Sequence, residues 1–574
     1  MSLINGALQI GRSAITASQA AITVTGNNLA NAATPGYSRQ NVHLQPTQYT
    51  EVAPGKYTGT GVALSDVRRQ VDDALNGRIR TAVGDSASWL VQQQTMIRVE
   101  AAFNELTEQD LSTRLNAFFG AWSSLQTQPE DIATRNVVLQ EGQSLTNFVR
   151  QMRSELDGIR QDLDDQVRYQ VQEADSLADQ IAQLNEQIVV AEAGRAGSAA
   201  ALRDQRDELL KQLSELINIT TREVDGGSVN VFIGNEPLIQ YSDCRGLSYR
   251  ESEDDSGNQL AQIIFTDKNQ AVDLTGGKLQ GLITARDDRL GTLIDDLDSW
   301  TQAMILEVNK IHSLGQGLDR FSSITSTYLV DDPDASLAEI NDTNLPWQVD
   351  NGVFYIQMYD ANGDKLGSPE MIQVKIGIDG NDTTMNSLAT AINSIDNLNA
   401  TVNDAGQLSI DADSGFTFGF VGPDDTDNET NVLAALGINN FFEGENAFDI
   451  AVKTGLTARQ LGASANGLTG NGDIAGRIAD LTNQGVASLN GISISQSFAA
   501  IVAQVATDSK GTQDNYSAAD VVVQTLQLER DSISGVSIDE EAIKMITFQR
   551  SFQGGSRYIS LINEMLDELI ALAG

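Results

Sequence analysis

The chain is poor in the residues that most enzyme chemistry and disulfide cross-linking require. It has one cysteine, Cys244, in a polar segment without a CxxC partner, so an intramolecular disulfide is excluded and a surface or edge-strand thiol is predicted. Its two histidines, His43 and His312, lie far apart in the sequence, and His43 is expected on a strand face. The HExxH, GxSxG and GxxxxGKS/T motifs are absent. We therefore expect no catalytic residue, no cofactor and no metal site, and no enzyme activity.

Basic residues are scarce as well. The chain has 37 Lys and Arg against 78 Asp and Glu, which gives a formal net charge of −41. This charge repels phosphate backbones and anionic lipids, so we expect no nucleic-acid partner and interpret the charge as an acidic solvated surface. Long apolar runs are missing too, because no segment reaches the roughly 20 apolar residues of a membrane-spanning helix. The first residues also lack an apolar signal core, so we expect neither membrane insertion nor secretion with a cleaved signal.

A regular apolar spacing marks the N-terminal segment and predicts a helix over residues 2–33. The predicted assembly seam on this helix consists of Leu3, Ala7, Ile10, Ala14, Ala17, Ala21, Val24 and Asn28, which recur in alternating steps of four and three. A second seam that includes Gly11 and Ile15 lies beside it, so the helix is expected to have more than one neighbour. The residues that follow form a predicted signature turn, namely Asn31, Thr34, Pro35, Gly36 and Tyr37. Pro35 suits the second position of a type II turn and Gly36 the third.

The last helix has the same kind of spacing. It opens at Ser537, which has capping-box spacing to Glu540. Its predicted seam consists of Ile538, Ala542, Met545, Phe552, Ile559, Leu566 and Ile570. Further apolar residues such as Phe548 and Leu569 lie outside this seam, so the apolar surface is wider than one partner covers. Gly554 and Gly555 predict a local weakness or bend, because each glycine costs about 1 kcal/mol inside a helix.

The chain is long enough, at 574 residues, for three or four domains. Helical spacing dominates from about residue 66 to 218 and includes a long coiled-coil arm, whereas alternating strand patterns begin near residue 219. We expect an α+β, multidomain fold with paired terminal coiled-coil helices, an elongated helical domain, and β-rich outer domains formed by the middle of the chain. The expected parts are a terminal assembly domain (1–40 and 531–574), a mainly helical domain with the arm (41–218 and 472–530), a β-rich domain with a long helix (219–344 and 456–471), and an outer α+β module (345–455).

One feature of this arrangement suggests how the chain is used. Neither end has a core of its own, so both ends are expected to be mobile until they pack against each other and against neighbouring copies.

Asp360 to Asp364 resembles the first half of a calcium loop, but the twelfth position has no glutamate, and Asn362-Gly363 alone predicts a hairpin turn.

The segment 27–40, NNLANAATPGYSRQ, resembles the N-terminal signature of flagellar rod, hook and hook-associated proteins. Its ending YSRQ, the C-terminal segment from SGVSIDEEAIKM onward, and the central GGKLQGL resemble the hook-associated protein 1 (FlgK) family of flagellar axial proteins. This resemblance implies a secreted structural subunit that forms an adaptor ring at the hook–filament junction. It also implies export through the flagellar type III channel, a homo-oligomeric ring, contacts with the hook protein and the next hook-associated protein, and an export chaperone on the C-terminal helix.

Two alternatives stay open from the sequence. A flagellar hook or rod protein shares the N-terminal signature, but those relatives enter β structure soon after it, and the long helices of 66–218 count against that interpretation. Separately, the outer module 345–455 is a candidate adhesin or ligand-binding unit.

Overall fold

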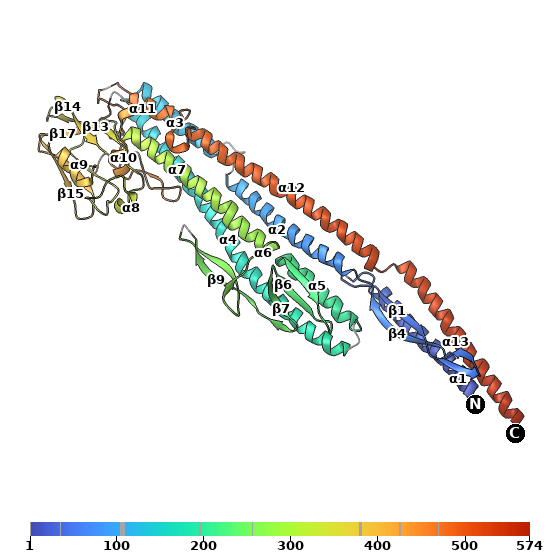
Figure 1. The fold of residues 1–574 in the computed structure, drawn as a ribbon. Helices are drawn as coiled ribbons and strands as arrows, with labels where there is room; N and C mark the ends of the chain where they lie inside the picture. Colours follow the sequence, from blue (N-terminus) through green and yellow to red (C-terminus); the bar gives the residue numbers. More distant parts are fainter. Residues whose placement is uncertain are drawn as a thin grey trace. The chain divides into compact units, whose positions relative to one another are not determined.

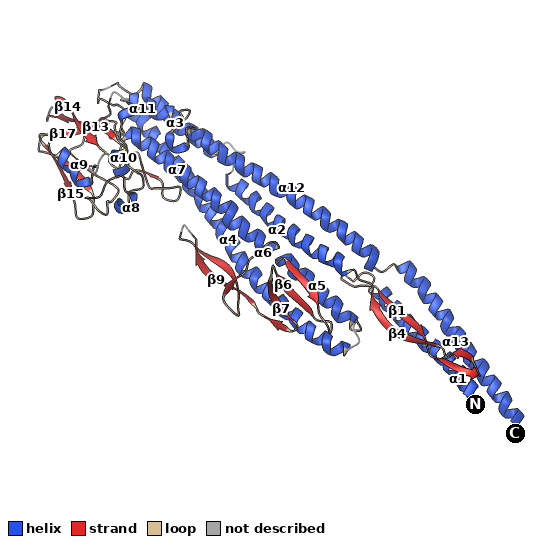
Figure 2. Cartoon of the chain, in the orientation of Figure 1, coloured by secondary structure: helices blue, strands red, loops and turns tan. Residues whose placement is uncertain are grey.

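The computed structural model describes residues 2–34, 36–103, 110–193, 197–254, 257–377, 382–423, 426–468 and 470–573. Long helices and several small antiparallel sheets make up the fold, so the expected α+β, multidomain class is confirmed (Figures 1 and 2). The chain divides into two compact units, one of residues 1–94, 162–286 and 511–574, the other of residues 95–161 and 287–510. The boundaries fall within α2 (Asp73–Phe103), α4 (Ile132–Glu192), the π-helix η1 (Thr284–Arg289) and α12 (Ile494–Ser534), which contribute residues to both units.

The two ends of the chain meet in the first unit. Helices α1 (Ser2–Ala30) and α13 (Ile538–Ala573) lie side by side (Figure 1). They are antiparallel, because Gly11 faces Ile559 whereas Gly26 faces Met545. A ribbon of β1 (Gln40–Pro46) and β4 (Val62–Arg69) contacts α1, and β2 (Tyr49–Ala53) pairs with β3 (Lys56–Gly59). The two terminal helices and the β1–β4 ribbon therefore pack together, with α1 in contact with both α13 and the ribbon.

The rest of the first unit combines the arm with two sheets. The helices are the N-terminal part of α2, the C-terminal part of α4, α5 (Ala200–Leu216), α6 (Lys278–Ile283) and the C-terminal part of α12. The first sheet has four antiparallel strands in chain order, β5 (Ile219–Glu223), β6 (Val229–Ile233), β7 (Glu236–Gln240) and β8 (Asp243–Cys244). The second consists of β11 (Gln270–Ala271), β10 (Gln259–Phe265) and β9 (Leu247–Glu253) in that order. The amide of Asn185 on α4 bonds the backbone of Val229 in both directions, which fixes the first sheet on the arm.

The second unit is centred on helices. They are the C-terminal part of α2, α3 (Leu111–Thr127), the N-terminal part of α4, the end of the π-helix η1 (Thr284–Arg289), α7 (Leu290–His312), α11 (Asp473–Asp480), η3 (Ala487–Leu489) and the N-terminal part of α12. An aromatic cluster of Phe118, Trp122, His312 and Phe441 packs in their core. Burial lowers the pKa of His312 to about 4, so its ring is neutral. Its Nδ1 donates to Asn439 O (2.8 Å) and its Nε2 accepts from Gly462 N (2.9 Å), which is a structural role.

The expected module at 345–455 contains small sheets in this unit. Its strands and helices are β13 (Gly352–Tyr359), β14 (Lys365–Val374), α9 (Met385–Ile392), β15 (Leu398–Val402), β16 (Leu408–Ala412), β17 (Thr417–Val421), η2 (Thr426–Asn428), α10 (Val432–Leu436), β18 (Phe442–Glu443) and β19 (Ala451–Val452). Before it in the chain come β12 (Ser323–Thr325), which pairs with β16, and α8 (Ile340–Thr343). The strand orders are β14-β13-β17, β12-β16-β15 and β18-β19. Asp360 caps the turn between β13 and β14 by accepting from the backbone of Asn362 and Asp364, so the predicted hairpin is confirmed.

Two sequence-based expectations need comment. The helical region was expected from about residue 66, but β4 runs to Arg69 and α2 begins at Asp73. The alternation of Val62, Leu64 and Asp66 is too short to separate a strand from a helix, and the pairing with β1 decides it. The four-part domain division stays a prediction, because the contacts group the chain into two units.

Candidate assembly interface

Small residues on α1 let α13 approach closely. Gly11 is buried against Ile559, and a Cβ on Gly555 would lie 3.5 Å from the Cβ of Ala14. Ala17 and Ala21 on the same helix are also buried, at 4% and 0% exposure. Ser18 and Thr25 of the second seam are buried as well, so the buried side of α1 includes residues of both seams expected from the sequence. Another part of α1 meets the β1–β4 ribbon, where Ser13 Oγ accepts from Val62 N at 3.2 Å. Helix α1 therefore has two neighbours within its own chain.

The predicted seam residues are distributed unevenly between buried and exposed positions. On α1, Ala17 and Asn28 are buried, Ala7, Ile10, Ala14 and Val24 are half-buried, and the side chain of Leu3 lies outside the described part. On α13, Ala542, Met545, Phe552, Ile559 and Leu566 are half-buried, whereas Ile538 and Ile570 are exposed. Their role in assembly stays a prediction.

Asn28 joins the end of α1 to the start of α13. Its Nδ2 donates to Glu541 Oε2 and to Gln40 O, each at 2.9 Å. Its Oδ1 accepts from Gln40 N at 3.0 Å and from the Tyr37 hydroxyl at 2.8 Å. The amide thus uses its full hydrogen-bonding capacity. We call Asn28, Tyr37, Arg39, Gln40 and Glu541 the Asn28 cluster.

Glu541 is the buried charge of this cluster, at 1% exposure. It accepts from Arg39 Nε at 2.9 Å and from Lys544 Nζ at 3.3 Å in addition to Asn28. Burial by itself raises the pKa of Glu541, but the hydrogen bonds from Asn28 and Arg39 and the charge of Lys544 outweigh it and bring the pKa below its ordinary value. The carboxylate is therefore ionised and paired at neutral pH.

Only one of the two hydrogen bonds of the predicted capping box forms at the start of α13, the one to the Ser537 side chain. Glu540 N donates to Ser537 Oγ at 3.4 Å, as a capping serine requires. The Glu540 carboxylate, however, accepts from Arg39 Nη2 at 2.7 Å. The side chain expected to cap the helix thus pairs with the other end of the chain.

The described residues of the signature turn fit the predicted type II geometry. Tyr37 N donates to Thr34 O at 3.3 Å, and Gly36 has a φ of 78°, as a type II turn requires at its third position. Pro35 lies outside the described residues. The side chain of Asn31 donates to Asn27 and accepts from the Thr34 hydroxyl, and Thr34 N donates to Asn31 O. These bonds stabilise the turn and do not reach α13. Burial, with the charges of Asp204 and Glu541, raises the pKa of Tyr37 to about 12.

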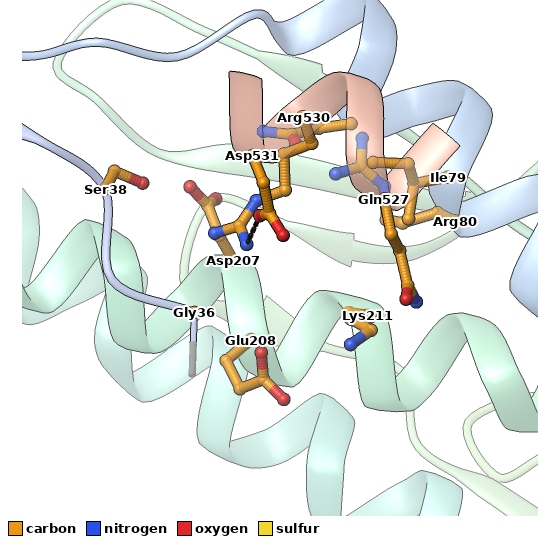
Figure 3. Close-up of a pocket in the computed structure, with 11 residues that line it drawn as sticks. Gly36, Ser38, Ile79, Arg80, Asp207, Glu208, Lys211, Gln527, Arg530 and Asp531 are labelled. Carbon is orange, nitrogen blue, oxygen red and sulfur yellow. Dashed lines mark hydrogen bonds and ion pairs between the residues drawn. The ribbon is translucent and has the colours of Figure 1, made fainter. Parts of the chain in front are cut away.

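The segment after the turn also rests on α5. Gly36 and Ser38 line a hollow of about 190 Å³ together with side chains of α2, α5 and α12, among them Asp207 and Asp531 (Figure 3). Arg69 at the end of β4 bonds Asp204 and Asp207 of α5 through Nη1, both at 2.7 Å. This attachment was missed from the sequence, although two acids three residues apart on one helix face are a visible signal for a basic partner.

One face of α13 is left uncovered by the described part of the chain. Its exposed large apolar side chains are Ile543, Ile546, Tyr558, Leu561, Met565, Leu569 and Leu572, whereas the exposed Ile538 and Ile570 belong to the predicted seam. Among the described residues, the helical stretch Ala487–Leu572 is also long and apolar enough, by length and composition alone, to cross a membrane. Core helices of soluble proteins pass the same test, and the expected absence of membrane insertion stays a prediction.

Comparisons with known proteins identify the family. Residues 96–323 match the family model of the flagellar hook-associated protein FlgK helical domain, residues 8–37 that of the flagella basal body rod protein, and residues 530–572 that of the flagellar basal body rod FlgEFG protein C-terminal region. Flagellar hook-associated protein 1 of Escherichia coli (strain K12) is 25% identical over 99% of both chains, and that of Bacillus subtilis (strain 168) is 24% identical over 98% of this chain and 97% of the relative. The chain belongs to the flagellar hook-associated protein 1 family.

Membership makes the chain a structural protein of the bacterial flagellum, as its relatives are, and not a member of an enzyme family. The flagellar hook junction protein FlgK from Burkholderia pseudomallei has a similar fold, with a TM-score of 0.50 and 15% identity over 80% of this chain and 100% of that one. The two terminal matches coincide with α1 and α13, so the family signatures lie on the helices that pair. Assembly with other flagellar proteins follows from this family.

Proposed function

We propose that the chain is an adaptor subunit of the hook–filament junction, exported and then assembled through α1 and α13. The observation that supports this most strongly is the uncovered apolar face of α13. Soluble proteins rarely leave a contiguous apolar face of this kind in water, and such faces mark interaction sites. The exposed apolar side chains on this face of α13 include Leu561, Leu569 and Leu572, which are 54%, 53% and 83% exposed.

The finer steps of the proposal follow from the same face. Before assembly it needs a protective partner, which fits an export chaperone that covers α13. After export, neighbouring copies in a homo-oligomeric ring bury it, and the hook protein and the next hook-associated protein contact the ring at its two ends. The net charge of −41 keeps the free subunits soluble by mutual repulsion.

Deletion of residues 537–574 tests the proposal. The deletion removes α13 and leaves most of the buried core, so the remaining chain should fold and stay soluble but should not enter the flagellum. A sharper variant replaces Ile543, Leu561 and Leu569 with glutamine, because these side chains are exposed in the single chain. Tyr169→Gln is the matched control, since Tyr169 is 66% exposed on α4.

Immunoblots of sheared flagella and motility assays in a strain without its own copy measure the outcome. Normal flagella built with the deletion variant would refute the assembly role. A glycan array with the full chain tests a ligand-binding role of 345–455 separately.

A further inference from the structure

Two glycines and two isoleucines form a reciprocal contact between the terminal helices. Gly11 and Ile15 are four residues apart on α1, and Gly555 and Ile559 are four residues apart on α13, so each pair lies on one helix face. Because the helices are antiparallel, Gly11 lies opposite Ile559 and Gly555 lies opposite Ile15. Each helix therefore offers a gap and fills the gap of the other.

The distances show that both gaps are occupied. A Cβ on Gly11 would lie 2.5 Å from Ile559 Cγ1 and 3.2 Å from its Cδ1. A Cβ on Gly555 would lie 3.1 Å from Ile15 Cγ1 and 3.5 Å from the Cβ of Ala14. Carbon atoms prefer separations of about 3.5–4.0 Å, so the first site has no space for a methyl group and the second has little.

Two other glycines of the same helices behave differently. A Cβ on Gly6 of α1 or on Gly554 of α13 would meet nothing within 4 Å. Closeness is thus a property of Gly11 and Gly555 and not of glycine in these helices generally. The weakness expected from Gly554-Gly555 has a packing reason at Gly555 only.

Register matters here because the rest of the seam is repetitive. The contacts place residues opposite each other when their numbers sum to about 570, and a slip by one heptad changes the sum by seven. Ile559 would then lie opposite Ser18 or Ile4, both of which have side chains where Gly11 has none. The alanine positions of α1, by contrast, accept almost any partner.

We propose that Gly11–Ile15 and Gly555–Ile559 form an interlock that determines the register in which α1 and α13 pair. The proposal rests on the proposed function, since it specifies the helix pairing that assembly uses. Steric exclusion by Ile559 and Ile15 rejects the shifted registers, while the small neighbours supply contact area without selectivity.

Cross-linking in the purified full-length chain tests the interlock. In a Cys244→Ser background, cysteines at Gly26 and Met545 report the observed register, because a Cβ on Gly26 lies 3.9 Å from Met545 Cε. Cysteines at Gly26 and Phe552 report a slip of one heptad, which moves the helices by about 10 Å. A short bifunctional maleimide then gives the ratio of observed to shifted product.

Gly11→Ala should lower this ratio about tenfold, the effect of an overpacking penalty of about 1.4 kcal/mol. Ile559→Ala added to Gly11→Ala should restore most of it, because it removes Ile559 Cγ1 and Cδ1, the former being the closest atom to the new methyl group, and leaves, among the nearest atoms, only Tyr558 Cδ1 at 3.2 Å. Gly6→Ala is the control and should leave the ratio unchanged. An unchanged ratio in Gly11→Ala, or an equal fall in Gly6→Ala, overturns the interlock.

The outcome is separable from that of the proposed function. If the chain without residues 537–574 still enters flagella, the assembly role fails whatever the cross-links show. If that chain is excluded from flagella and Gly11→Ala keeps the original ratio, only the interlock fails.

Discussion

Asn28 Nδ2 lies 2.9 Å from Glu541 Oε2, and these two residues are 513 positions apart in the chain. Both are 1% exposed. A buried carboxylate that loses a partner is costly, whereas a complete network is tolerated and fixes one arrangement. The Asn28 cluster thus holds the start of α13 against the end of α1 by a contact that no local sequence preference can supply.

Asn28→Asp should loosen the terminal pair. The new carboxylate would lie against Glu541 and could not donate the hydrogen bond of the amide, so we expect local opening of α1 to become easier by about 3 kcal/mol. Hydrogen exchange of α1 amides measures this opening. Asn27→Asp is the control, because Asn27 is exposed on the same turn. Equal exchange in both variants would contradict the structural role of the cluster.

The second unit should lose stability as the pH falls from about 6.5 to about 4. In the folded chain, burial lowers the pKa of His312 from 6.5 to about 4, with the charges of Lys453 and Arg135 acting in the same direction. The unfolded state therefore binds a proton first, and the stability present above pH 6.5 falls by up to about 3 kcal/mol. Denaturant unfolding at pH 7 and pH 5 measures the change. His312→Gln should reduce the difference between the two pH values, and an identical difference in the variant would sink this prediction.

Limited proteolysis of the purified monomer should remove the ends first. Trypsin sites are present at Arg12 in α1 and at Lys544, Arg550 and Arg557 in α13. The pair is held by small residues and a partly exposed seam, so opening there should cost less than in the core. Mass spectrometry of timed digests identifies the first cuts. Ends as resistant as α4 would indicate a self-contained protein.

The Cys244 thiol should react slowly in the folded chain. Burial, together with the nearby charges of Asp179 and Asp175, raises its pKa to about 12. Little thiolate is then present at pH 8, so alkylation by iodoacetamide should be at least about tenfold slower than in denaturant. Mass spectrometry of the alkylated peptide gives both rates. Equal rates would mean that β8 opens readily at this edge.

Spacing along the sequence was enough to predict both terminal helices, because a buried stripe recurs with the helical period whatever its partner is. The spacing could not predict which element packs against each stripe. The buried side of α1 includes Gly11 and Ser18 from the second seam, and Ile538 and Ile570 of the predicted α13 seam are exposed. Periodicity identifies apolar faces, whereas the choice of partner depends on contacts between distant residues.

Polar contacts were the least predictable part of the interface. Glu540 has the spacing of a capping residue, yet it pairs with Arg39. His312 was recognised only as one of two histidines, and its burial depends on carbonyl and amide partners at Asn439 and Gly462. Such partners are brought together only when the chain folds, so the sequence around each residue carries no pattern that predicts them.

The antiparallel pairing of α1 and α13 brings the N-terminal end of α1 and the C-terminal end of α13 to the same end of one helix pair (Figure 1). An affinity tag or fluorescent protein fused to either terminus would therefore be placed at the same spot, and moving a troublesome tag from one terminus to the other would not relieve crowding there. An internal surface loop, such as the β13–β14 turn at Asn362, is the better position for a label.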